Sequence, residues 1–160
     1  MNEMFCTTSV FTESATLPDS IKESAFEYFD ELETTIFYSK KFFEGIERDG
    51  LPEPEVVNLF EKITNLSGSL VYSFIHKDDG IAYFGETGNG NQRLRQHMAQ
   101  IETGKASSDF IEGLLAYDDD PNNWQAWVWR TPNKLAAQVL ERMLINYIPT
   151  MFNSAEHGGI

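Results

Sequence analysis

A predicted β-hairpin in the middle of the chain constrains the fold more than any other feature. Two short apolar runs, residues 69–76 and 81–85, lie on either side of the pair Asp79-Gly80. An Asp-Gly pair between two such runs is typical of the tight turn that joins antiparallel strands. The sequence therefore predicts a two-stranded antiparallel unit at this position.

Four side chains capable of chemistry follow one another along this part of the chain. Tyr72 and Tyr83 each occupy one predicted strand, and Arg93 and His97 follow on a helix expected at about 91–102. A small sheet can direct these groups into one cleft suited to phosphodiester cleavage, because a guanidinium binds two phosphate oxygens at once. An alternative stays open: strand tyrosines often pack in a core, and the basic pair could share a solvated helix face.

The segments after this helix predict an α+β fold. Residues 107–109 favour the start of a helix, and residues 124–130 alternate in a way that suits a third strand. Thr131 and Pro132 are suited to begin a last helix, which would end before Pro149. We therefore expect a small three-stranded antiparallel sheet flanked by helices, with a helical N-terminal extension.

The N-terminal part has a different composition. A long helix is expected from about Ser20, with Glu23 completing a capping box, and a shorter helix is expected over residues 55–65. We divide the chain into an acidic helical N-terminal region, residues 1–66, and a second domain, residues 67–160, that contains the predicted sheet.

The formal net charge of −13 is unevenly distributed. Residues 1–66 carry 14 acidic and 5 basic side chains, whereas residues 67–160 carry 11 and 7. Because non-specific affinity for nucleic acid comes from lysine and arginine, this balance argues against broad charge-driven binding to nucleic acid. Most of the acidic side chains lie outside the part that carries the candidate residues.

Cysteine content and hydropathy indicate the cellular setting. Cys6 is the single cysteine, which excludes a disulfide framework and favours a reducing compartment. No apolar run is long enough to span a bilayer, and the first residues lack the basic stretch of a signal peptide. We expect a cytoplasmic protein with no membrane association.

The order of these residues resembles the GIY-YIG nuclease family, which is named after two tyrosine motifs on adjacent strands. Leu70-Val71-Tyr72 corresponds to the first motif and Tyr83-Phe84-Gly85 to the second. The first motif departs from the family pattern by having Leu-Val before its tyrosine, which are still apolar strand residues. The resemblance covers about residues 68–153, and it implies the family's small sheet with flanking helices.

Further positions extend the resemblance. The arginine expected on the next helix matches Arg93, the histidine of many members matches His97, and the late acidic residue matches Glu141. The asparagine often found after the last helix matches Asn153, although an asparagine there could equally satisfy backbone groups in a turn. Ala106 stands where some homing-type members carry a second histidine, so proton transfer must depend on Tyr72 or His97.

The resemblance implies a metal-dependent endonuclease that hydrolyses DNA phosphodiester bonds. In the family's mechanism Tyr72 would take a proton from the attacking water, which requires a nearby cation or metal to lower its pKa. Arg93 would stabilise the transition state, and Glu141 would bind Mg²⁺ or Mn²⁺. Tyr83 and His97 complete the catalytic set, and the residues that we assign to substrate binding are Gly85, Arg95, Lys105 and Asn153.

The residues around Glu141 support a metal ligand independently. A carboxylate that borders Ile145 and Ile148 on the last predicted helix lies beside an apolar face, where an unpaired charge is unfavourable. A metal ion would compensate for this, and a hard oxygen ligand suits Mg²⁺. A salt bridge from Glu141 to Lys134 or Arg142 is the competing interpretation.

Two other interpretations of the whole chain stay open. The chain could be a catalytically weak or inactive GIY-YIG-fold interaction protein, whose acidic surface binds a basic partner or mimics DNA. Residues 1–66 could also fold over the Arg93 cleft and restrain an active enzyme. Since one small active site cuts one strand, cleavage of both strands would require a homodimer or two successive events.

Overall fold

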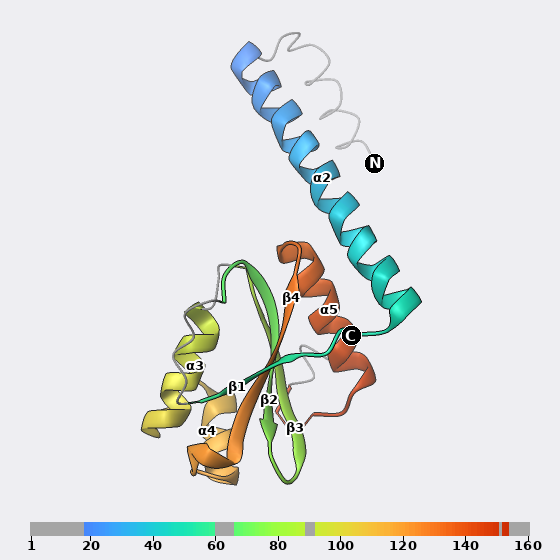
Figure 1. The fold of residues 1–160 in the computed structure, drawn as a ribbon. Helices are drawn as coiled ribbons and strands as arrows, with labels where there is room; N and C mark the ends of the chain where they lie inside the picture. The colour runs from blue at the N-terminus through green and yellow to red at the C-terminus, as the bar shows by residue number, and fades with distance from the viewer. Residues whose placement is uncertain (1–17, 60–65, 89–91, 151, 154–160) are drawn as a thin grey trace, which may run out of the picture. The chain divides into compact units, whose positions relative to one another are not determined.

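The computed structural model of the chain describes residues 18–59, 66–88, 92–150 and 152–153. The predicted α+β class is confirmed, with one antiparallel sheet flanked by helices (Figure 1). In chain order the elements are α2 (Asp19–Asp49), β1 (Glu55–Asn58), β2 (Ser69–His76), β3 (Gly80–Thr87), α3 (Gln92–Thr103), α4 (Asp109–Tyr117), the 3-10 helix η1 (Pro121–Asn123), β4 (Trp124–Thr131) and α5 (Lys134–Tyr147).

The sheet has four strands in the order β1-β4-β2-β3, and every neighbouring pair is antiparallel. β2 is central, and all of its residues are buried. One face of the sheet packs against α3 and α4 through a core that includes Phe74, Leu94 and Ile111. The other face packs against α5 through Val71 and Leu140. β3 forms one edge of the sheet and contacts both α3 and α5.

The predicted helix over residues 55–65 is wrong in its described part. Glu55–Asn58 forms strand β1, with Val56 opposite Trp127 of β4. Val56 and Val57 favour an extended backbone, and β4 offers them a free edge, so sheet pairing outweighs the helical periodicity of this short run. The sheet therefore has four strands instead of the three predicted. Residues 60–65 of the predicted helix lie outside the described residues.

Most other boundaries agree closely with the sequence, and β2 has the predicted bounds. The start of α5 differs, because Asn133 and not Thr131 is the cap. The Asn133 side chain accepts a hydrogen bond from the backbone nitrogen of Ala136 at 2.9 Å. Thr131 instead ends β4, where its hydroxyl donates to the carbonyl of Ser69 at 3.0 Å. Asn133 satisfies a backbone donor of the first helical turn, which is the usual role of such a cap.

The long N-terminal helix is confirmed as α2, and the pattern of contacts divides the chain within it. One unit is Met1–Phe37 and the other is Tyr38–Ile160. In the second unit the aromatic rings of Phe42 and Phe43 pack against the core on the α5 side of the sheet. The division into residues 1–66 and 67–160 stays a prediction about domain organisation.

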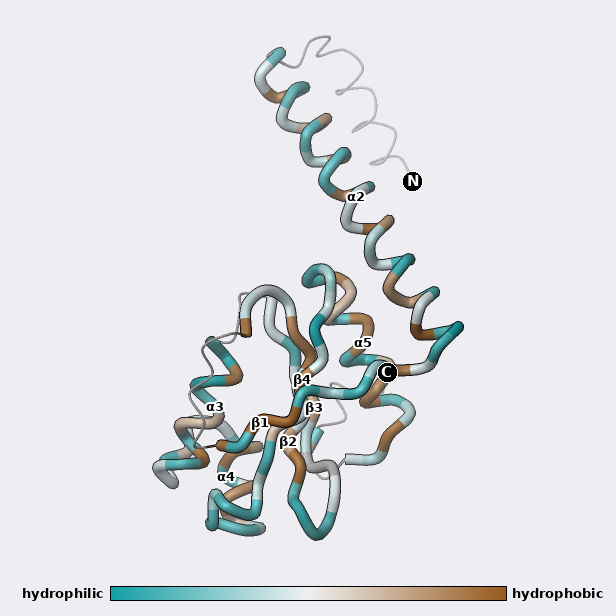
Figure 2. The backbone as a smooth tube through the Cα atoms, in the orientation of Figure 1, coloured by the Kyte–Doolittle hydropathy of each residue, from teal (hydrophilic) through white to brown (hydrophobic). Residues whose placement is uncertain are grey.

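In the first unit, α2 exposes large apolar side chains, including Phe26 at 67 % and Phe29 at 56 %. Figure 2 shows hydrophobic positions along the whole length of this helix. None of the described helices combines the length and the apolar character needed to cross a membrane. The cytoplasmic location stays a prediction.

Candidate active site

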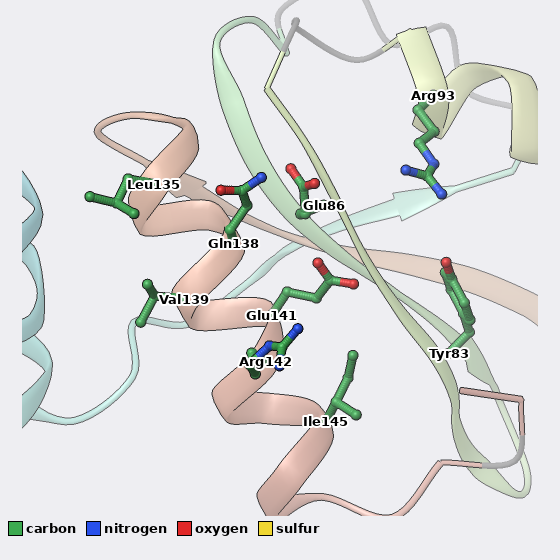
Figure 3. Close-up of a pocket in the computed structure, with 9 residues that line it drawn as sticks. All are labelled: Tyr83, Glu86, Arg93, Leu135, Gln138, Val139, Glu141, Arg142 and Ile145. Carbon is green, nitrogen blue, oxygen red and sulfur yellow. The ribbon is translucent and has the colours of Figure 1, made fainter. Parts of the chain in front are cut away.

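A cleft of about 500 Å³ lies at the β3 edge of the sheet, between α3 and α5 (Figure 3). Tyr83 and Glu86 enter it from β3, Arg93 enters from α3, and Glu141 and Arg142 enter from α5. Two of the side chains that the sequence assigns to catalysis and one assigned to metal binding therefore meet in one cleft.

The position of β3 explains why side chains from both faces of the sheet meet here. Successive residues of a strand point to opposite faces. Tyr83 belongs to the core on the α3 and α4 side, and Phe84 belongs to the core on the α5 side. Because β3 is an edge strand, side chains from the two faces can converge around it without crossing the sheet.

Arg93 lies in the first turn of α3 with its side chain exposed. It forms no ion pair with any residue in the described part of the chain. Its charge lowers the pKa values of Tyr72, Tyr83 and Glu141, although burial raises all three by more. Arg93 is therefore close enough to act on every ionisable group proposed for the reaction.

The two tyrosines occupy different depths. Tyr72 is fully buried, and its hydroxyl has no hydrogen-bond partner among the described residues. Tyr83 is 5 % exposed, lines the cleft, and stacks on Phe110 with 4.0 Å between ring centroids. Burial, followed by the neighbouring Tyr83, raises the pKa of Tyr72 well above its usual value. Burial also raises the pKa of Tyr83. Both phenols therefore stay protonated at neutral pH. Either one could accept a proton only if additional positive charge nearby made it ionise first.

Gly85 permits the close approach of the Tyr72 ring to β3. A Cβ atom at position 85 would lie 2.5 Å from Cζ and 2.6 Å from the hydroxyl oxygen of Tyr72. A side chain at this position would therefore displace the phenol. The glycine of the second tyrosine motif thus has a clear packing role in this chain, whereas its contact with substrate stays a prediction.

Glu141 shares the cleft with a second carboxylate, Glu86, which the sequence did not suggest as a site residue. Burial, followed by the charge of Glu86, raises the pKa of Glu141 to about 7. The Oε2 atom of Glu86 is buried and has no hydrogen-bond partner within the described structure. Among the described residues, Glu141 forms no salt bridge with Lys134 or Arg142, which was the competing interpretation.

These two carboxylates fit a divalent cation better than any structural role that we can identify. Mg²⁺ is commonly held by one or two carboxylates and several waters. Two partly buried acids without a basic partner are costly, and a bound cation would offset that cost. Within the described ranges no larger group of acidic, histidine or cysteine side chains is arranged to hold a metal ion.

His97 does not line the cleft of Glu141. It is 8 % exposed, and its ring lies 4.8 Å from that of Phe110 and 6.2 Å from that of Tyr72 between centroids. Burial, with a further contribution from Arg93, lowers the pKa of His97 to about 4, so the imidazole is neutral at neutral pH. His97 instead lines a second cleft, of about 410 Å³, which shares Glu86 and Arg93 with the first.

The remaining predicted substrate residues lie outside both clefts. Arg95 and Lys105 are exposed and line neither one. The side chain of Asn153 pairs with the edge of β3, where it accepts from the backbone nitrogen of Phe84 at 2.8 Å and donates to its carbonyl at 2.9 Å. Asn153 therefore fixes the strand that carries Tyr83, which agrees with the backbone role left open from the sequence. Substrate contacts by these three residues stay predictions.

Comparison with known proteins supports the assignment made from the residues. A family model described as the GIY-YIG catalytic domain matches residues 68–148. The match spans half of the chain and includes both tyrosines, Arg93 and Glu141, and the chain therefore belongs to the GIY-YIG family. Enzymes with this domain are nucleases that act on DNA and generally use divalent metals. No curated protein and no solved structure gives a match.

Proposed function

We propose that this protein is a divalent-metal-dependent endonuclease that hydrolyses DNA phosphodiester bonds. The observation that carries the proposal is the meeting of Arg93 and Glu141 in one cleft, together with Tyr83, although they come from elements far apart in the chain. Transition-state charge on a phosphate is best stabilised by preorganised cationic groups, and hydrolysis also requires a group that accepts a proton from water.

Each residue has a proposed role. Arg93 binds the non-bridging oxygens of the scissile phosphate and stabilises their charge in the transition state. Glu141 would hold Mg²⁺ or Mn²⁺, and the cation would supply further neutralisation of charge at the phosphate. The family resemblance assigns to Tyr72 the proton of the attacking water, although this fully buried residue lines neither cleft, so water would have to reach it past Tyr83. Tyr83 borders the substrate on the cleft wall.

The raised pKa of Tyr72 opposes its proposed role, because only the ionised side chain can accept a proton from water. Burial disfavours the phenolate, while Arg93 favours it. Binding of a cation by Glu141 would remove the effect of one negative charge and favour the phenolate further. His97 is neutral at neutral pH and has free ring nitrogens in the described structure, so we retain it as the second candidate for proton transfer.

A plasmid-nicking assay tests the proposed function. The full chain should convert supercoiled plasmid to the open circular form in Mg²⁺ or Mn²⁺, and EDTA should stop the reaction. Glu141→Gln should remove this activity, whereas Glu102→Gln, which changes an exposed acid of α3 outside both clefts, should retain it. Absence of metal-dependent nicking by the folded wild-type chain would exclude the proposal.

Substitution of each tyrosine separates their roles. Tyr72→Phe should abolish nicking if Tyr72 is the proton acceptor, and Tyr83→Phe should then retain a measurable rate. The reverse order of rates would assign the proton transfer to Tyr83, whose side chain lines the cleft.

An inactive interaction protein is the alternative function. It is favoured by the acidic, partly apolar surface of α2, where Phe26 and Phe29 are exposed beside many carboxylates. In that case the chain would cut nothing and would block a basic DNA-binding protein at a stoichiometric ratio. The restraint hypothesis concerns residues 1–66, and removal of residues 1–37 tests it while keeping strand β1 in the sheet. A higher nicking rate is expected if the removed part covers the cleft. Sedimentation of the active protein with and without DNA would test a homodimer.

A further inference from the structure

The second cleft has a composition unlike that of the first. Its α3 wall is formed by Gln92, Gln96 and Gln100, which are four residues apart and therefore lie on one face of the helix. Lys134 of α5 forms another part of the wall. Its aliphatic stem lies so close to Gly88 that a Cβ atom there would be 2.8 Å from Cδ of the lysine. The charged groups of this cleft are Lys134, Arg93 and Glu86.

His97 provides an independent indication that this cleft receives a ligand. Its side chain is more than nine-tenths buried, it lines the cleft, and neither ring nitrogen has a hydrogen-bond partner among the described residues. Buried polar atoms in proteins are nearly always hydrogen-bonded, so an unpaired buried imidazole at a cleft wall points to a partner supplied from outside. The neutral ring has one donor and one acceptor to offer.

We propose that this second cleft binds the nucleotide that flanks the scissile phosphate, with Gln96, the middle glutamine of this face, contacting the edge of its base and Gln92 and Gln100 lining the cleft on either side. The inference rests on the proposed endonuclease function. Arg93 lines both clefts, so a phosphate held by Arg93 would lie between the hydrolytic cleft and the glutamine face. Lys134 would contact the next phosphate of the same strand.

Side-chain amides suit this role because each carries both donors and acceptors. A glutamine can make two hydrogen bonds to one base edge, most favourably with adenine. The amide of Gln100 is already oriented, because its Oε1 accepts from the backbone nitrogen of Ser107 at 3.2 Å. This leaves the amide nitrogen to face a ligand as a donor.

The charge of the chain makes such contacts important. A net charge of −13 gives little non-specific attraction to DNA. Placement of the scissile phosphate must then depend more on local hydrogen bonds to bases, which also confer a preference for the flanking base.

Two measurements on the full chain test the proposal. First, the rate of cleavage is measured on short duplexes that differ only in the base pair beside the mapped cut, for the wild type and for Gln96→Met. Ala99→Met serves as the control, because it places the same side chain on an exposed part of α3 outside both clefts. Second, the side-chain amide resonances of the glutamines are followed by NMR as a short oligonucleotide is added in EDTA.

We expect the wild type to prefer certain flanking bases, and Gln96→Met to reduce this preference roughly tenfold, within the range for one lost base contact. The control should keep the preference, and the amide resonances of Gln92, Gln96 and Gln100 should shift with the oligonucleotide. A chain that cleaves DNA with equal preference in wild type and variant, and without these shifts, overturns the inference but leaves the endonuclease function intact. A chain that cleaves nothing but shows the shifts overturns the function and retains nucleotide binding.

Discussion

Two clusters of ionisable side chains in the sheet domain differ in whether their charges have partners. Near the hairpin turn, His76 Nε2 lies 2.8 Å from Asp118 Oδ2, and His76 Nδ1 lies 3.3 Å from Asp79 Oδ2. The carboxylate of Asp79 also accepts a hydrogen bond from the Tyr117 hydroxyl. In the candidate active site, neither Arg93 nor Glu141 has an ion-pair partner in the described ranges.

The difference separates structural charges from functional ones. The His76 cluster joins β2, the hairpin turn and the segment after α4, so its polar groups are occupied by contacts that hold these elements together. Under the proposed function, the charges of the cleft would bind a phosphate and a cation, and the folded protein carries the electrostatic cost of leaving them without ion-pair partners. Substitutions in the first cluster should therefore reduce stability, and those in the second should reduce activity.

The largest effect is expected at Arg93. Arg93→Ala should lower the metal-dependent nicking rate by on the order of 10³-fold, because it removes a preorganised positive charge from the transition state. The urea midpoint should stay within experimental error of the wild type, since the side chain is exposed and has no ion pair in the described part of the chain. Lys77→Ala removes the same charge from an exposed site outside both clefts and is the matched control. Undiminished nicking by the arginine variant would remove Arg93 from the active site.

His76→Ala should reduce stability and leave activity unchanged, which is the opposite of what we expect for Arg93→Ala. Loss of the contact with Asp118 and of ring packing against Trp124, at 5.0 Å between centroids, should lower the free energy of unfolding by roughly 2–3 kcal/mol. Urea denaturation measures this change. The nicking rate per folded molecule should be unchanged at a temperature where the variant is folded, and a selective loss of activity would contradict the structural role.

The affinity for a divalent cation should depend on pH because the pKa of Glu141 is about 7. Below that pH a metal ion must displace a proton, so the apparent affinity for Mn²⁺ should fall by up to about tenfold per pH unit. Isothermal titration across about pH 6 to 8 measures this slope. Glu86→Gln should shift the onset of the fall to lower pH, because Glu86 is the second cause of the raised pKa. A pH-independent affinity would argue against Glu141 as a ligand.

The smallest effects are opposite changes of stability with pH. Glu141 binds its proton more tightly in the folded chain, so this group costs stability as the pH rises from about its ordinary value of 4.5 to about 7. Glu141→Gln should therefore stabilise the metal-free protein near pH 8, by about 1 kcal/mol after allowance for solvent screening, and have no such effect near pH 4.

The contribution of Asp118 to stability should change with pH in the opposite direction to that of Glu141. The hydrogen bond from His76 is the largest cause of the lowered pKa of Asp118, so its contribution is present at neutral pH and is lost as the pH falls below its ordinary value. Asp118→Asn should destabilise the protein at neutral pH and have less effect in strong acid. Thermal unfolding over this pH range tests both variants. If Glu141→Gln and Asp118→Asn both stabilised or both destabilised the protein at neutral pH and above, the distinction between the two clusters would be refuted.

Features that depend on neighbouring residues were predictable from the sequence. The Asp79-Gly80 pair and its flanking apolar runs define the hairpin, and β2 has the predicted bounds. β1 was not predictable, since the evidence for a strand at Glu55–Asn58 is its pairing with β4, which lies far along the chain. Glu86 and Lys134 were missed as cleft residues for a similar reason, because neither belongs to a local motif.

The order of tyrosines, arginine and glutamate along the chain was enough to indicate the family. The sequence also determined three of the four strands, because turn chemistry and alternation act over a few residues. The tertiary structure alone decided that β3 stands at an edge where α3 and α5 both reach it. It also decided that Glu86 shares a cleft with Glu141, that His97 lines a second cleft, and that Asn153 hydrogen-bonds to β3. These arrangements depend on strand order and on burial, which arise from contacts between distant segments and have no signature in any one of them.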